Sequence, residues 1–119
     1  MNNVQETIEK IRGGVVTVEE LSQYIDSSLL LVKANAILAI IKQNISESSI
    51  LLKLYETSLK RHQESKVIGA WNNGHLATAA LKMIKTRESQ DLYEKSIREV
   101  NIDEKIDIER LIDQLHQMM

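Results

Sequence analysis

Apolar residues recur along this chain at intervals of three and four, the spacing that gathers side chains on one side of an α-helix. The first stripe is Val4, Ile8 and Ile11, and the pair Gly13-Gly14 after it is typical of a helix end. The same spacing returns along the rest of the chain. Helices are therefore expected over residues 3–12, 18–26, 29–41, 47–62 and 75–85, from Ser89 onwards, and over 104–117.

Small polar residues indicate where several of these helices begin. Thr17 and Glu20 have the spacing of a capping box, in which each side chain accepts a hydrogen bond from the other residue's backbone. The run 26–28, Asp-Ser-Ser, is expected to cap the third helix. Either Ser46 or Ser48 is expected to cap the fourth.

The stretch LLLVKANAILAII, residues 29–41, is the most apolar run of the chain, and Lys33 and Asn35 interrupt it. A membrane-spanning helix needs about 20 apolar residues, so this run is too short and too charged to span a bilayer. A helix that is apolar on most of its circumference has neighbours on several sides, which predicts an interior helix rather than a binding surface. Leu38 is expected to be buried, Asn35 to lie on an open face, and Lys33 to lie at a groove between helix pairs.

Residues 63–74 follow no helical period. Val67, Ile68 and Trp71 predict a short packed turn, either irregular or helical. The run 72–74, Asn-Asn-Gly, is typical of a break between elements and is expected to be polar and exposed. Trp71 beside it is either an anchor for a partner protein or a plug at the end of the hydrophobic layer.

Composition narrows the fold class. The chain of 119 residues has no Pro, no Cys and only four Gly, so it lacks the turn residues that all-β folds need and has no disulfides. An all-α fold in a single domain, residues 1–119, is expected. The N-terminal segment has neither a basic start nor an apolar run, so we expect no signal peptide and a cytoplasmic protein.

Two segments share a pattern of apolar and alanine positions at helical spacing, and the first also carries a basic residue, Lys33. Residues 32–40, VKANAILAI, resemble the second helix of a HEAT repeat, with Asp26 in the turn ahead of it. A second copy of the pattern uses Ala77, Ala80, Leu81 and Ile84. The resemblance implies a short right-handed stack of antiparallel helix pairs. The alternative is a compact helical bundle without repeats.

The HEAT-like resemblance also implies a function. Such stacks are non-catalytic scaffolds or adaptors for protein–protein interaction, and they bind along the face lined by the second helices of their pairs. On this chain that face would offer Lys33, Asn35, Lys42, Thr78, Lys82 and Lys85, and the loop before the second copy adds Trp71, Asn72, Asn73 and His75. A weakly basic face suits an acidic segment of a protein partner. The apolar end, Met118-Met119, raises the alternative of a homodimer.

Charge gives an alternative function. Residues 1–87 carry 11 basic and 8 acidic groups, whereas residues 88–119 carry 4 basic and 9 acidic groups. The basic residues of the middle segment, together with Trp71, suggest contacts to a nucleic-acid backbone as the alternative. These basic residues are Lys53, Lys60, Arg61, Lys66, Lys82, Lys85 and Arg87.

Catalytic chemistry finds little support in the sequence. The three histidines, His62, His75 and His116, fall on separate helices and lack metal-ligand spacing, so neither a metal nor a cofactor is expected. The acidic residues at 103–109 lie near a helix start, where they favour the helix dipole. With no catalytic motif in the chain, we do not expect an enzyme.

Overall fold

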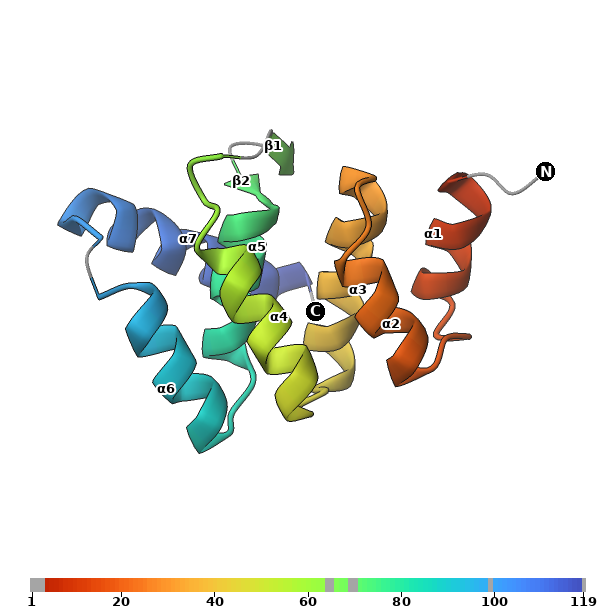
Figure 1. Ribbon diagram of the computed structural model, residues 1–119. Coiled ribbons are helices and arrows are strands. Elements are labelled where there is room, and N and C mark those ends of the chain that lie inside the picture. Colours follow the sequence, from red (N-terminus) through yellow and green to blue (C-terminus); the bar gives the residue numbers. More distant parts are fainter. Residues whose placement is uncertain (1–3, 64–65, 69–70, 99, 119) are drawn as a thin grey trace.

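Residues 4–63, 66–68, 71–98 and 100–118 are described by a computed structural model (Figure 1). The described chain is all-α, as predicted, with one short hairpin of two strands inserted between its fourth and fifth helices. The elements are α1 (Val4–Arg12), α2 (Val18–Ile25), α3 (Leu30–Gln43), α4 (Ser48–Ser58), β1 (Lys66–Ile68), β2 (Trp71–Asn72), α5 (Asn73–Met83), α6 (Arg87–Ser96) and α7 (Ile102–Met118).

Alternate helices pack side by side in two layers (Figure 1). In one layer α1 packs on α3, α3 on α5, and α5 on α7. In the other layer α2 packs on α4, and α4 on α6. Between the layers α2 contacts α3, while α4 and α6 both contact α5. The folded chain measures 45 × 28 × 25 Å, and α3 and α5 lie at its centre.

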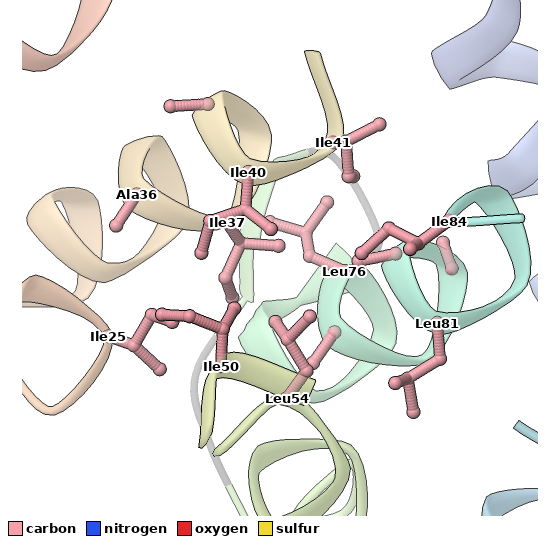
Figure 2. Close-up of a cluster of buried hydrophobic side chains, with 14 of the residues drawn as sticks. Ile25, Ala36, Ile37, Ile40, Ile41, Ile50, Leu54, Leu76, Leu81 and Ile84 are labelled. Carbon is pink, nitrogen blue, oxygen red and sulfur yellow. The ribbon is translucent and has the colours of Figure 1, made fainter. Parts of the chain in front are cut away.

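Aliphatic side chains from α3, α4 and α5 form the middle of the core (Figure 2). Ile37 and Ile40 of α3 meet Ile50 and Leu54 of α4, and Leu76 extends the cluster to α5. The interior position predicted for residues 29–41 is confirmed, because eight of the fourteen residues of α3 are buried. Among the described helices, none is both long and apolar enough to cross a membrane.

The ends of α1 and α2 follow the predicted chemistry. Gly14 adopts a φ of +74°, and its N–H donates to the carbonyl oxygen of Ile11, which closes the last turn of α1. At the start of α2, Glu20 N–H donates to Thr17 Oγ1 and Thr17 N–H donates to Glu20 Oε1. The capping box predicted from Thr17 and Glu20 is therefore confirmed.

Three other helix starts differ from the predictions. No side chain caps α3 or α4, whose N-cap residues are Leu29 and Glu47. The hydroxyl of Ser27 accepts from Leu29 N–H just ahead of α3, which is a local turn rather than a cap. The cap of α6 is Thr86, whose Oγ1 accepts from Ser89 N–H, so this helix starts two residues before Ser89.

The segment predicted to be an irregular or helical turn contains the hairpin instead. Strands β1 and β2 pair antiparallel with a register shift, and Lys66 lies opposite Asn72. The run 72–74 does not break the chain into a loop, because Asn72 caps α5 by accepting from His75 N–H. Ala70, Glu64 and the side chain of Ile68 lie outside the described part of the structure.

Candidate functional site

A groove of about 800 Å³ lies over the side of α3 that faces away from the core. Its floor is formed by Asn35, Leu38, Ala39 and Lys42 of α3. The C-terminal end of α1, residues 11–14, borders it, and Met118 at the end of α7 reaches its edge. Figure 1 shows how the C-terminal end of α7 returns to the neighbourhood of α3. Three helices that are distant in sequence therefore share this surface.

The periodicity of α3 explains why apolar side chains line the groove. Leu31, Asn35, Leu38 and Lys42 follow at i, i+4, i+7 and i+11, so they share one side of the helix. Leu31 is 52% exposed and Leu38 is half-buried. The prediction that Leu38 is buried between helices is therefore wrong, because no helix covers this side of α3 completely. Uncovered apolar surface of this kind, next to polar residues, is typical of binding sites.

The side chain of Asn35 is buried, contrary to the exposed position predicted for it. Asn35 is only 7% exposed, and two hydrogen bonds make the burial of its amide group tolerable. Arg12 Nε donates to Asn35 Oδ1 at 3.0 Å, and Asn35 Nδ2 donates to the carbonyl oxygen of Leu31 at 2.8 Å. Asn35 thus lies beneath Arg12 at the base of the groove, and Lys33 is half-buried elsewhere on α3.

The groove is positively charged. Arg12 and Lys42 are exposed and are its charged residues, and no Asp or Glu belongs to its described lining. The carbonyl groups at the end of α1 would oppose an anion, but the N–H groups of Gly13, Gly14 and Val15 already bond three of them. The groove therefore combines an apolar floor with two cations.

Three residues predicted to bind a partner are instead engaged inside the fold. Asn72, Asn73 and Thr78 are all buried. Asn72 donates to the carbonyl oxygen of Arg61, and Asn73 Nδ2 donates to that of Leu30 at 3.1 Å. The exposed, polar loop predicted over residues 72–74 is thus wrong, because these amides satisfy backbone carbonyl groups of neighbouring elements.

Trp71 and His75 lie together at the base of the hairpin, both half-buried. Their rings meet edge to face with centroids 5.5 Å apart. His75 Nδ1 also accepts from Asn72 N–H at 3.2 Å, which completes the cap of α5. Burial lowers the pKa of His75, and nearby Glu104 partly offsets this effect. The packing fits the role of plug for Trp71, one of its two predicted roles.

Lys82 and Lys85 are exposed, but the groove over α3 does not include them. They line a separate shallow depression of about 420 Å³ together with Arg87. Lys82 also places its ammonium group 5.1 Å from the ring centroid of Tyr93. The basic face predicted as one surface is therefore divided, with Lys42 on one part and Lys82 and Lys85 on the other.

Arg61, one of the basic residues predicted as possible contacts to a nucleic acid, is buried at 7% exposure. Its guanidinium group pairs with Glu104 and donates to Thr78 Oγ1 and to Ser96 Oγ. Sequence reasoning missed this site, although Ser58, Thr78 and Ser96 at inward helical positions were a signal for a buried polar partner. Arg61 is thus removed from the set of basic residues available to a ligand.

Neither a family model, nor a curated protein, nor a solved structure matches this chain. Among the described residues, no group of three or more His, Asp or Glu side chains lies so that it would hold a metal ion. The function must therefore be inferred from the surfaces of the chain itself, and the groove over α3 has the most distinctive combination of shape and charge.

Proposed function

We propose that this protein is a non-catalytic binding module that holds an acidic, partly apolar segment of another protein in the groove over α3. The observation that carries the proposal is the combination of an apolar floor at Leu38 and Ala39 with two cations, Arg12 and Lys42, and no acidic residue among the described residues of the lining. Apolar contact supplies affinity, and complementary charge supplies orientation and specificity.

The arrangement of the helices bears on the HEAT-like part of the proposal. The alternation of two layers supports a stack of helix pairs, in which α3 and α5 are second helices. The burial of Asn35 counts against a repeat-like placement of α3 and favours the compact bundle. Thr78 is buried and α7 packs against α5. The proposed binding surface is therefore limited to the groove over α3, whereas the HEAT-like resemblance implies a surface that continues along α5.

A selection from a random peptide library tests the proposal. Peptides enriched on the protein should carry acidic and apolar residues, and Leu38→Glu should abolish their binding because it places a carboxylate on the apolar floor. Leu52→Glu is the matched control, because Leu52 is 51% exposed and belongs to α4 in the other layer. Enriched peptides that bind the Leu38 variant as well as the original protein would refute the proposal.

Binding to a nucleic-acid backbone is the second candidate function. One observation favours it, namely the depression that brings Lys82, Lys85 and Arg87 together, with no acidic residue in the part of its lining that the structure describes. Two other basic residues of the middle segment already form ion pairs within the protein, Lys53 with Asp26 and Arg61 with Glu104. Three clustered cations are few for a dedicated nucleic-acid surface, and we therefore favour a protein partner.

A further inference from the structure

We infer that the groove over α3 recognises a helix with two carboxylates seven residues apart, the first bound by Arg12 and the second by Lys42. The inference rests on the proposed function and specifies the ligand of the same site. Asn35 is a positioning residue in this scheme, because it touches Arg12 and not the ligand.

The guanidinium group of Arg12 is fixed before any ligand arrives. Its Nε donates to Asn35 Oδ1, and Asn35 is itself fixed by its bond to the carbonyl oxygen of Leu31. Within the described chain, no residue accepts a hydrogen bond from either Nη nitrogen of Arg12. A guanidinium group held in this way keeps two parallel N–H donors for a carboxylate, which is the arrangement that binds both carboxylate oxygens.

The distance between the two cation positions sets the spacing of the ligand. Asn35, which anchors Arg12, and Lys42 are seven residues apart on α3, or about 10.5 Å along the helix axis. Leu38 and Ala39 lie midway between them. A ligand helix that runs along α3 repeats this spacing when its carboxylates are at i and i+7 and its apolar residues at i+3 and i+4.

The backbone around the groove favours a helix over a strand as the ligand. The lining residues belong to α1, α3 and α7 and to the turn after α1. In that turn, Gly13 N–H donates to the carbonyl oxygen of Glu9, and Gly14 N–H donates to that of Ile11. An extended ligand would find no strand edge to pair with, whereas a helix satisfies its own backbone hydrogen bonds.

A second copy of the chain does not supply the ligand through its own α7. That helix has exposed Ile102 and Ile106 among acidic residues, so it is the most obvious candidate within the chain. Its acidic residues, at positions 103, 104, 107, 109 and 113, include no pair that is seven apart. Glu19 and Asp26 are seven apart, but Asp26 pairs with Lys53. The positions between them that would meet the apolar floor are the polar Ser22 and Gln23. The ligand is therefore a segment of a different protein.

Synthetic peptides of about 16 residues, long enough to form some helix alone, test the spacing. The matched peptide carries Glu at i and i+7 and Leu at i+3 and i+4. The control has the same composition with the second Glu at i+5, which lies on another side of the helix. In fluorescence anisotropy titrations of the labelled peptides, the matched peptide should bind about tenfold more tightly, as expected for one lost charged contact.

Two variants test the role of Arg12 and its support. Arg12→Lys keeps the charge but loses the pair of parallel donors, so it should weaken binding of the matched peptide several-fold. Asn35→Asp keeps an acceptor for Arg12 Nε but adds a competing carboxylate, so it should weaken the same peptide about tenfold. A peptide with Gln in place of both Glu should bind this Asp variant and the original protein equally. Circular dichroism melts confirm that both variants fold.

The possible failures separate the two proposals. If the two Glu peptides bind equally, and Leu38→Glu abolishes both, the carboxylate spacing is refuted and the groove remains a binding site. If an extended peptide with carboxylates three residues apart binds more tightly than the matched helix, the helical ligand is refuted. If no peptide, matched or selected from a library, depends on Leu38, both the spacing and the proposed function are refuted.

Discussion

Arg61 and Glu104 form an ion pair inside the protein, with 2.9 Å between Nε and Oε1, although they are 43 positions apart in the sequence. The remaining guanidinium donors bond the carbonyl oxygen of Ser58, Thr78 Oγ1, and both Oγ and the carbonyl oxygen of Ser96. These partners come from α4, α5, α6 and α7. One side chain therefore connects four helices at one end of the fold.

Loss of this side chain should destabilise the protein strongly. Arg61→Ala leaves Glu104 without its buried cation and removes one donor from each of two buried hydroxyl groups, which should lower the free energy of unfolding by about 3–5 kcal/mol. Urea titrations followed by circular dichroism measure the change. Lys60→Ala is the control, because this neighbouring residue is exposed and should change stability by less than about 0.5 kcal/mol. Equal effects of the two substitutions would contradict the buried network.

The pKa of His75 makes part of the stability depend on pH. Because burial lowers this pKa in the folded protein, the unfolded chain binds a proton more readily. The contribution of neutral His75 is complete above the unfolded pKa of about 6.5 and is lost as pH falls from there toward the folded pKa. Urea titrations at several pH values should show stability falling with acidity, and His75→Gln should reduce the slope. Gln114→Ala, at an exposed position without a titratable group, should leave it unchanged.

Two leucines should differ in their contribution to stability. Leu76 is fully buried in the central cluster, so Leu76→Ala should cost about 2–5 kcal/mol. Leu38 is half-buried over the groove, so Leu38→Ala should cost only about 1 kcal/mol. The same urea titrations compare the two. A cost for Leu38 as large as that for Leu76 would mean that the groove is closed in solution.

The basic depression gives a prediction for nucleic acid. With only three clustered cations, the protein should show no appreciable affinity for a generic DNA duplex near physiological ionic strength. Anisotropy titrations with a labelled duplex at several salt concentrations test this. A complex that weakens steeply with salt and is lost in the double variant Lys82→Glu, Lys85→Glu would establish the nucleic-acid function instead.

The helices were predictable because their signals are local. Thr17 and Glu20 are three residues apart, and the apolar stripe of α3 lies within 14 residues, so both features can be read from neighbouring positions. The short hairpin was missed because its strands of three and two residues are too brief to establish a period. Element type was therefore easier to predict than the form of short connections.

The polar interior was not predictable from the same signals. Arg61 at the end of a helical stripe looks like a surface residue, and only partners 17, 35 and 43 residues away make its burial tolerable. Asn35 presents the same difficulty, because Arg12 lies 23 residues before it. Of the predicted site residues, the structure places Asn35 and Lys42 at one groove. Those from Trp71 onward lie at least 29 positions later in the sequence, and local patterns do not show where the fold places them.

The edge-to-face contact of Trp71 with His75 also means that intrinsic tryptophan fluorescence reports on the base of the hairpin. Trp71 is the only tryptophan of the chain, so all indole emission arises at this point. A protonated imidazole beside an indole ring quenches its excited state, whereas a neutral one does so weakly. The emission of the unlabelled protein should therefore follow the charge of His75, and it reports on the start of α5 without any added probe.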